Sequence, residues 1–158
     1  MPVQQQEFMR RAIALSRQKM AANCGGPFGA VIVRQDKVIA EGWNRVTSSA
    51  DPTAHAEVVA IRAACKTLGD YRLNGCDIYT SCEPCPMCLA AIYWARLEHI
   101  YYANTRADAA AIGFDDAFFY QQINLPEEKR TIPTKRILPD EASAVFSEWL
   151  KKADRQQY

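Results

Sequence analysis

His55, Cys85 and Cys88 have the side-chain types and the spacing of a metal site. The two cysteines form a Cys-x-x-Cys pair in Pro84-Cys85-Pro86-Met87-Cys88. Pro86 is typical of the first position of a helix, so both sulfurs should lie near a helix N-terminus, where free N–H groups and the helix dipole favour thiolates. One imidazole nitrogen and two thiolates suit zinc. We therefore predict one zinc ion per chain, bound by His55, Cys85 and Cys88.

Glu57 lies two residues after His55, and this position suggests a catalytic role rather than metal ligation. Residues two apart on a helix do not share a face, so Glu57 is better placed beside a metal-bound water than as a fourth ligand. Structural zinc sites usually have four protein ligands, whereas catalytic sites keep a position for water. His-x-Glu followed by Pro-Cys-x-x-Cys is the pattern of zinc-dependent nucleobase deaminases, in which the glutamate is the general acid and base.

Two other interpretations of the cysteines remain open at this stage. A Cys-x-x-Cys pair also occurs in redox proteins and in zinc modules without catalysis, and Cys82 forms a second such pair with Cys85. Pro84 favours extended chain before Cys85, so we interpret Cys82 as a packed thiol rather than as an alternate ligand. We expect Cys24, Cys65 and Cys76 to be ordinary buried residues and His99 to be structural.

The elements that must position these residues alternate between strands and helices. We expect strands at 28–34 and 38–43 joined by a hairpin, a third at 76–81, a fourth at 98–103 and a fifth at 132–138. Helices are expected over 3–22, from an Asp51-Pro52 start to Gly69, from Pro86 to Arg96 and over 140–155, with helix and loop mixed across 107–130. His55 would then lie in the first turn of its helix. A helix between the third and fourth strands requires a parallel pair, so the pattern predicts an α/β domain with a mixed sheet.

Length and composition limit the classes of protein this chain can be. The sequence has 158 residues, and 49% of them are hydrophobic. A chain of this length and composition can form one domain with a real core. A formal net charge of +1 gives no general attraction to nucleic acid. We find no apolar run of membrane-spanning length, and the polar start of the sequence lacks a signal-peptide core, so we expect a cytoplasmic protein.

Several longer motifs make the chain resemble the cytidine-deaminase-like superfamily and, within it, the small bacterial guanine deaminases. These motifs are GGPFGAVIV, DPTAHAEV, AIRAAC, YTSCEPCPMCL, AIYWAR and GFDD, together with a C-terminal tyrosine. The resemblance covers nearly the whole chain and is weakest across 120–150. It implies a single deaminase domain over residues 1–158, built as an α/β/α fold of three layers around a five-stranded mixed sheet.

The resemblance also implies roles for particular residues. His55, Cys85 and Cys88 would bind zinc, and Glu57 would shuttle protons. Asp116 would bind the edge of the base or assist proton transfer. The residues implied to hold or surround the purine are Phe28, Asn44, Ala54, Trp94 and Tyr158. Tyr158 would come from the partner subunit of a homodimer that exchanges its C-terminal segments.

The activity implied is hydrolysis of guanine to xanthine and ammonia, a reaction of purine catabolism or salvage, with a free nucleobase as substrate. The alternative is a tRNA adenosine deaminase or another nucleobase or nucleoside deaminase with the same metal motif. An enzyme that binds tRNA needs a basic surface, and the near-neutral charge of this chain argues against one.

Overall fold

Strand β1 (Gly29–Arg34) lies inside a four-stranded sheet whose order is β2-β1-β3-β4. It pairs antiparallel with β2 (Lys37–Trp43) on one side and with β3 (Cys76–Cys82) on the other, and β3 pairs parallel with β4 (His99–Asn104). The α-helix α4 (Pro86–Trp94) connects β3 to β4, as a parallel pair requires. The computed structural model describes residues 3–157 of the chain.

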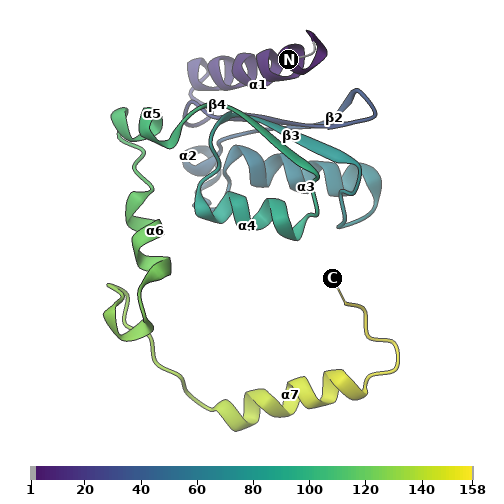
Figure 1. Cartoon of the computed structure of the whole chain (residues 1–158), viewed down its shortest axis with the longest axis vertical. Helices are drawn as coiled ribbons and strands as arrows, with labels where there is room; N and C mark the ends of the chain where they lie inside the picture. Colours follow the sequence, from purple (N-terminus) through teal and green to yellow (C-terminus); the bar gives the residue numbers. More distant parts are fainter. Residues whose placement is uncertain (1–2, 158) are drawn as a thin grey trace. The chain divides into compact units, whose positions relative to one another are not determined.

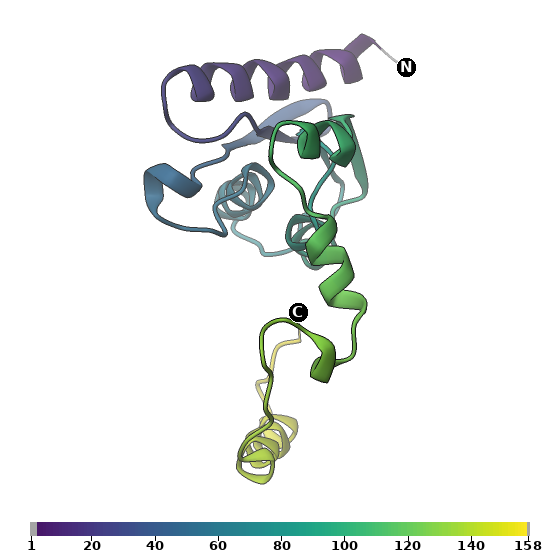
Figure 2. The same cartoon turned by 90° about the vertical axis from the view of Figure 1, so that its left-hand side faces the viewer.

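Helices cover both faces of this sheet. Helix α1 (Val3–Ala21) packs on one face, where Ala12 meets Val31, Val33 and Tyr79. Helices α3 (Ala56–Leu68) and α4 lie on the other, over a larger core that includes Ile32, Ile78 and Leu73. Figure 2 shows α1 on one side of the sheet and α3 and α4 seen nearly end-on at the other. The three-layer α/β/α arrangement is therefore confirmed.

Gly42 allows β2 to lie directly against the first turns of α3. A Cβ atom on Gly42 would come 2.1 Å from the carbonyl oxygen of Ala56 and 2.5 Å from the amide nitrogen of Ala60. Glycine, which has no Cβ, is what lets strand and helix backbones come this close. This contact fixes the N-terminal end of α3, which carries His55, relative to the sheet.

The chain divides by its internal contacts into two units, residues 1–117 and 118–158. The first contains the sheet, the helices named above, the short helix α2 (Val46–Ser49) and helix α5 (Arg106–Ala111). The second contains α6 (Ala117–Asn124, which begins at the boundary), the 3-10 turn η1 (Glu127–Lys129) and α7 (Pro139–Lys151). Figure 1 labels the helices and strands along the chain.

The expected fifth strand at 132–138 is wrong. Within the described residues, the sheet ends at β4 and residues 132–138 form no strand. Pro133 lacks the N–H that a ladder needs. The apolar side chains of Ile132 and Ile137 are 78% and 70% exposed, so neither is packed into a core as a sheet strand would be. The predicted helix over 140–155 is present as α7 but is shorter than expected.

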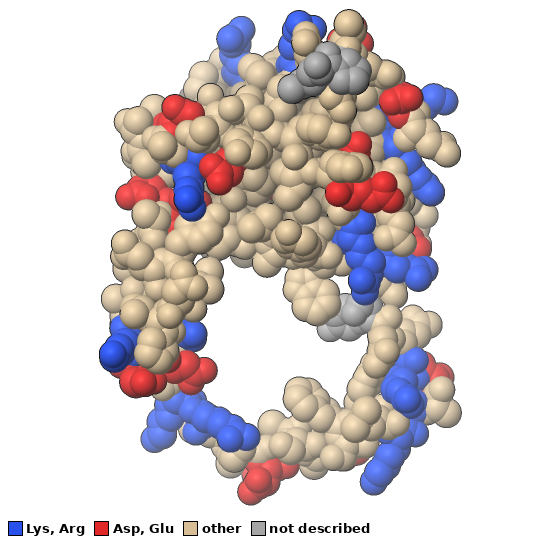
Figure 3. Space-filling view, in the orientation of Figure 1, with Lys and Arg blue, Asp and Glu red and all other residues tan. Residues whose placement is uncertain are grey.

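Charged side chains of both signs are distributed over the surface. On the face drawn in Figure 3, groups of Lys and Arg alternate with groups of Asp and Glu. None of the described helices is both long and apolar enough to cross a bilayer. The cytoplasmic location stays a prediction.

Candidate metal centre and its surroundings

His55 and Cys85 are the N-cap residues of two different helices. His55 immediately precedes α3, and Cys85 immediately precedes α4, whose first residue is Pro86. Both have the extended backbone expected of N-caps, with ψ of 156° and 168°. The prediction that Pro86 opens a helix is therefore confirmed. The predicted helix start at Asp51-Pro52 is wrong, since α3 begins only at Ala56 and His55 lies just before its first turn.

The sheet brings these two helix starts together. Strand β1 runs antiparallel to both β2 and β3, so β2 and β3 point the same way and their C-terminal ends lie at one edge of the sheet. The loop after β2 carries His55, and the loop after β3 carries Cys85. The carboxyl ends of such strands are where ligand sites of α/β folds are commonly found.

The geometry of the three side chains fits a tetrahedral zinc ion. Nδ1 of His55 lies 3.5 Å from Sγ of Cys85 and 3.5 Å from Sγ of Cys88. Zinc–nitrogen bonds of about 2.0–2.1 Å and zinc–sulfur bonds of about 2.3 Å at a tetrahedral angle place such atoms roughly 3.5 Å apart. The potential ligand atoms of the three residues all lie within 4.8 Å of one another. The donor set and its spacing therefore fit zinc, with Nδ1 as the ligand atom of the histidine.

The pKa values of the two thiols are shifted in opposite directions. The interaction with the neighbouring Cys88 thiol lowers the pKa of Cys85 to about 4, and the imidazole of His55 lowers it further against the effect of burial. The pKa of Cys88 is raised, first by its interaction with Cys85 and then by burial. Cys85 is therefore the more acidic of the two thiols, and metal binding releases whatever thiol protons its ligands still carry.

Glu57 is buried against this cluster. Its side chain accepts hydrogen bonds from Oγ1 of Thr80 (3.0 Å, at Oε1) and from Sγ of Cys88 (3.4 Å, at Oε2). The residue is only 6% exposed. Burial disfavours the charged form of a carboxyl, and it is the main reason why the pKa of Glu57 is raised. The prediction that Glu57 lies beside the metal site agrees with these contacts.

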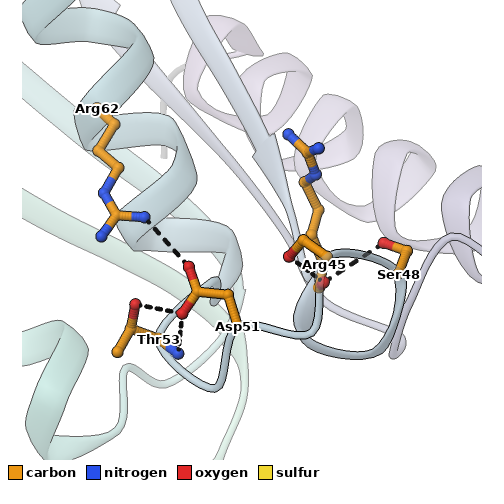
Figure 4. A network of polar contacts seen from close by, with 6 residues as sticks. Arg45, Ser48, Asp51, Thr53 and Arg62 are labelled. Atoms are coloured by element: carbon orange, nitrogen blue, oxygen red, sulfur yellow. Dashed lines mark hydrogen bonds and ion pairs between the residues drawn. The ribbon is translucent and has the colours of Figure 1, made fainter.

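A closed loop holds the backbone that leads into His55. The Asp51 carboxylate accepts hydrogen bonds from the amide nitrogen (2.8 Å) and Oγ1 (2.7 Å) of Thr53, and it forms a 3.6 Å ion pair with Arg62 of α3. These contacts lower the pKa of Asp51, the Thr53 hydroxyl contributing most. The amide of Arg45 donates to the carbonyl of Ala54 at 2.9 Å, which closes the loop. Figure 4 shows the Asp51 carboxylate between Thr53 and Arg62.

Asn44 and Phe28 lie side by side at the edge of the sheet near this loop. The amide nitrogen of Asn44 donates to the carbonyl of Phe28 at 3.0 Å. Oδ1 of the Asn44 side chain accepts from the amides of Gly26 and Val46, both at 3.3 Å. Its Nδ2 donor has no hydrogen-bond partner among the described residues. Asn44 thus has a positioned side chain with one donor group available.

Gly25 is needed for this arrangement. Its φ is +147°, and a Cβ atom there would lie 1.8 Å from the carbonyl oxygen of Asn44. Phe28 meets the ring of Phe114 edge to face, with the ring centroids 5.0 Å apart. The glycine loop therefore brings an amide donor and two aromatic rings into one place.

The two acids of the Phe114-Asp115-Asp116 segment have different surroundings. Oδ1 of Asp115 accepts from the amide of Ala117 at 2.9 Å, so Asp115 caps the following turn. The pKa of Asp116 is raised, first by burial and then by the negative charge of Cys85. The role of Asp116 in binding the base or in proton transfer stays a prediction.

The remaining predicted substrate-binding residues are Ala54, Trp94 and Tyr158. Ala54 is buried directly before His55. Trp94 is the last residue of α4, at the end opposite Cys85, and is 64% exposed. Tyr158 lies outside the described residues. The roles of these three residues in substrate binding remain predictions.

The other thiols and His99 largely follow the prediction. Cys82 is buried, and its Sγ donates to the carbonyl of Thr105 at 3.6 Å, which supports a packed thiol. Cys76 is buried as expected, but Cys24 and Cys65 are only partly buried, so the expectation is wrong for these two. Cys65 packs against the margin of the larger core. His99 pairs with Asp77 across β3 and β4 at 2.8 Å.

Thr80 and Phe114 are neighbours of the site that the sequence reasoning did not single out. Thr80 shares a face of β3 with Ile78, so strand alternation alone places it towards α3 and α4. Its contact with Glu57, however, joins residues 23 positions apart and depends on the packing of α3. Phe114 belongs to the GFDD motif, but its ring contact with Phe28 depends on the fold of the chain after β4.

Comparisons with known proteins agree with this geometry. Residues 2–104 match the cytidine and deoxycytidylate deaminase zinc-binding region. The chain belongs to this deaminase family. The matched region contains His55, Glu57, Cys85 and Cys88, and its description as a zinc-binding region agrees with the zinc-compatible cluster described above.

Known members of the family resemble the chain to different extents. It is 54% identical to the guanine deaminase of Bacillus subtilis over 151 residues, which cover 96% of this chain and 97% of that protein. The crystal structure of guanine deaminase from the same organism superposes with a TM-score of 0.95 at 52% identity, covering 100% and 99% of the two chains. A tRNA-specific adenosine deaminase of Agrobacterium fabrum is 45% identical over 95 residues, 60% of this chain and 62% of that protein.

Proposed function

We propose that this chain is a zinc-dependent guanine deaminase that hydrolyses guanine to xanthine and ammonia. The observation that carries the proposal is a buried glutamate held beside a His-Cys-Cys cluster, in a chain that is similar to a guanine deaminase over nearly its whole length. Water supplies the incoming oxygen, and the amino group at C2 of guanine leaves as ammonia. This reaction removes an amino group from a free purine and therefore belongs to purine breakdown or salvage.

Glu57 moves the protons of this reaction. His55, Cys85 and Cys88 would hold the zinc, which when bound would activate a water for attack on the carbon that bears the amino group. The Glu57 carboxylate takes a proton from that water and delivers it to a ring nitrogen of the base. Thr80 donates to Oε1 of Glu57 and so holds the carboxylate in one orientation through the proton transfer. Glu57, or Asp116 in its place, then passes the remaining proton of the added hydroxyl to the amino group, which leaves as ammonia while the carbon becomes a carbonyl.

Phe28 and Asn44 hold the base. The Phe28 ring offers an apolar surface for stacking, and Phe114 supports it edge to face. The Nδ2 donor of Asn44 pairs with an acceptor on the edge of the purine, while its Oδ1 is fixed by two backbone amides. Asp116 binds the opposite, donor edge of the base through its carboxylate. Free guanine needs no phosphate-binding surface, which fits the alternating charges in Figure 3.

A homodimer that exchanges its C-terminal segments completes the site in this proposal. Unit 118–158 has exposed apolar side chains along one face of α7 at positions 142, 145, 146, 149 and 150, the spacing of an amphipathic helix. Val145, Phe146 and Leu150 are 60% to 75% exposed within a single chain. Such a face needs a partner, and a second copy of the chain supplies one. The whole chain then acts as a single deaminase domain whose Tyr158 closes over the site of the partner subunit.

Ammonia release from a panel of substrates tests the activity. Guanine, adenine, cytosine, guanosine and a tRNA with adenosine in its anticodon are each incubated with the zinc-loaded protein, and ammonia is measured. We expect turnover with guanine and little with the nucleosides or tRNA. Glu57→Gln is the inactive control, with full zinc content and turnover lowered by about 10²–10⁴-fold. Turnover of the tRNA alone would support a tRNA adenosine deaminase, and near-normal turnover by Glu57→Gln would exclude the proposed mechanism.

A further inference from the structure

A pocket lies at the opposite end of strand β3 from the zinc cluster. Its volume is about 320 Å³, which is within the usual range for pockets that hold small ligands. It lies between the first turns of α1, the β1–β2 turn and the start of β3. The residues that line it are Gln4, Gln5, Phe8, Val33, Gln35, Asp36, Gly75, Asp77 and Tyr79. In Figure 1 the N-terminal end of α1 and the β1–β2 turn lie towards the same side of the first unit.

Strand alternation explains why these side chains gather there. Val33 of β1 and Tyr79 of β3 belong to the sheet face covered by α1, and Asp77 shares that face because it lies two residues before Tyr79. The two central residues of the β1–β2 turn, Gln35 and Asp36, have φ of 49° and 58°. Positive φ at both positions is the mark of a type I′ hairpin. This tight turn brings Asp36 to the rim beside α1.

The wall of the pocket is aromatic. The rings of Phe8 and Tyr79 are tilted against each other with centroids 5.3 Å apart, and Tyr79 stacks on Tyr101 at 4.5 Å. Gln5 donates to the hydroxyl of Tyr101 at 3.1 Å, which links α1 to this stack. The aromatic surface is therefore held in place from both sides.

Tyr79 has an unused hydroxyl in this pocket. The residue is only 3% exposed, yet its hydroxyl has no hydrogen-bond partner among residues 3–157. The hydroxyl oxygen itself is therefore accessible from the pocket, since among the described residues no buried side-chain nitrogen or oxygen lacks a partner. The pKa of Tyr79 is raised to about 12, first by burial, then by Tyr101 and by the negative charges of Asp77 and Asp36. A polar group thus faces a pocket that is also lined by the carboxylates of Asp36 and Asp77.

The charged side chains that line the pocket are both acidic. Asp36 and Asp77 contribute two carboxylates, and no Lys or Arg is among the lining residues. Arg34 is close in sequence, but it follows Val33 along β1, so strand alternation directs it to the opposite face of the sheet. Lys37 follows Asp36 but does not line the pocket. This excess of negative charge favours the binding of a positively charged ligand.

We propose that this pocket binds a small organic cation that carries an ammonium or guanidinium group. The carboxylates of Asp36 and Asp77 neutralise the charge, and the rings of Phe8 and Tyr79 add cation–π attraction. An N–H of the ligand donates to the Tyr79 hydroxyl. A bare metal ion would gain nothing from the aromatic wall, and His99 already holds Oδ1 of Asp77 at 2.8 Å. The proposal does not depend on the proposed deaminase activity.

The pocket and the zinc cluster are at opposite ends of β3. Asp77 lies near the beginning of this strand and Cys82 at its end. A separation of five residues corresponds to roughly 17 Å at the usual rise of a strand. Occupancy of the pocket therefore leaves guanine binding sterically unhindered. Loss of deaminase activity and loss of cation binding are consequently separable in one preparation.

Isothermal titration of the zinc-loaded protein with agmatine tests the proposal. Agmatine carries both a guanidinium and an ammonium group, and 1,4-butanediol is the neutral control. We expect a single agmatine site with a dissociation constant in the submillimolar range and no binding of butanediol. Asp36→Asn and Asp77→Asn should each weaken binding about tenfold, the factor equivalent to about 1.4 kcal/mol at 25 °C. Tyr79→Phe, which keeps the ring, should weaken it about threefold.

The controls separate a specific site from general charge effects. Asp140→Asn on α7 changes the charge by the same amount and should bind agmatine like the wild-type chain. Thermal unfolding of each variant shows that the fold is intact, and guanine deamination should stay at the wild-type rate in Asp36→Asn and Tyr79→Phe. Absence of agmatine binding at millimolar concentrations, equal binding of butanediol, or unchanged affinity in both Asp36→Asn and Asp77→Asn would each overturn the proposal.

Discussion

At the scale of single residues, the site depends on the contacts of His55 Nδ1 with the sulfurs of Cys85 and Cys88. Nδ1 of His55 is equidistant from the sulfurs of Cys85 and Cys88, whereas the sulfur of Cys82 is turned towards the carbonyl of Thr105. The two Cys-x-x-Cys pairs that share Cys85 are therefore not equivalent. Only the later pair, in which Cys85 caps α4 and Cys88 lies in its first turn, faces the histidine.

We predict that Cys88→Ala loses zinc and activity together, because two protein ligands hold zinc much more weakly than three. Cys82→Ala should retain both, since the Cys82 thiol only packs at the end of β3. Metal analysis of the purified variants by plasma emission spectrometry, compared with about one zinc per wild-type chain, checks this expectation. Full zinc content in Cys88→Ala would show that the ligands are assigned wrongly.

Thr80 is a positioning residue for Glu57. Its hydroxyl donates to Oε1 of the buried carboxylate, and hydrogen bonds to charged groups contribute about 1.5–3 kcal/mol. Thr80→Val preserves the shape of the side chain and removes the donor. We expect kcat for guanine to fall roughly tenfold or more, since about 1.4 kcal/mol of barrier corresponds to a factor of ten, while KM changes little.

Thr80→Ser restores the hydroxyl and is the matched control. Steady-state kinetics of the two variants should show kcat recovering in the serine variant, with zinc content equal in both. If Thr80→Val turns over guanine like the wild-type chain, the hydrogen bond serves only packing. A rise in KM without loss of kcat would equally contradict a role for Thr80 in orienting Glu57.

At the scale of elements, two helix N-termini build the site, and the sequence predicted one of them better than the other. Pro86 marked the start of α4 correctly, because proline fits only the first turn of a helix. Asp51-Pro52 looked like the start of α3 for the same reason, but the Asp51 carboxylate closes a turn with Thr53 instead of capping the helix. The local sequence around each proline could not show that Pro86 begins a helix whereas Pro52 lies in a turn.

The zinc ligands and Glu57 could be predicted because their types and spacing are local features of the sequence. The Thr80–Glu57 bond and the Phe28–Phe114 contact could not, since each joins residues brought together only by the packed fold. The prediction of a fifth strand is wrong for a related reason. Residues 132–138 have the apolar pattern of a strand, but a strand forms only where another strand offers hydrogen-bond partners.

The Asp51 loop should determine how firmly His55 is held. Asp51→Ala removes the acceptor of two Thr53 hydrogen bonds and the ion pair with Arg62, so the chain before His55 becomes more mobile. We expect zinc to be released roughly 3–10-fold faster to a chromophoric chelator, because partners that orient a metal ligand affect retention of the metal. Asp70→Ala is the matched control: Asp70 forms a similar turn with Arg72 after the end of α3.

The contribution of Asp51 should also depend on pH. Its pKa in the folded chain is lowered, so the stabilisation it gives is present above the usual aspartate pKa and is lost as pH falls through the lowered value. The difference in melting temperature between Asp51→Ala and the wild-type chain should therefore narrow in acid, as measured by thermal unfolding from pH 7 downwards. A zinc-release rate equal to that of Asp70→Ala would show that the loop does not restrain His55.

At the scale of the whole molecule, the second unit does not bury its own apolar residues. Among its described residues, unit 118–158 contains helices and turns but no sheet, and the apolar face of α7 is largely exposed in a single chain. A stable monomer rarely leaves a continuous apolar helix face in water. The proposed homodimer accounts for this face and for the length of chain that follows the sheet.

We therefore predict that Phe146→Glu combined with Leu150→Glu converts the protein from a dimer to a monomer. These side chains lie four residues apart on α7, so they share one face of the helix. They are 75% and 65% exposed, so the substitutions place charge where an apolar contact is needed without disturbing the core of the first unit. Analytical ultracentrifugation should give twice the mass of one chain for the wild-type protein and the mass of a single chain for the variant.

The matched control is Ser147→Glu, which adds charge on α7 away from its apolar face and should remain dimeric. Zinc content should be equal in all three proteins, because the ligands belong to the first unit. If the C-terminal segment closes the partner's site, guanine deamination should fall strongly in the monomeric variant, and removal of residues 156–158 should have a similar effect while the dimer persists. A wild-type protein that sediments as a monomer would refute the dimer. A monomeric variant with full guanine turnover would instead show that each chain closes its own site, with Phe28 and Phe114 sufficient to cover the base.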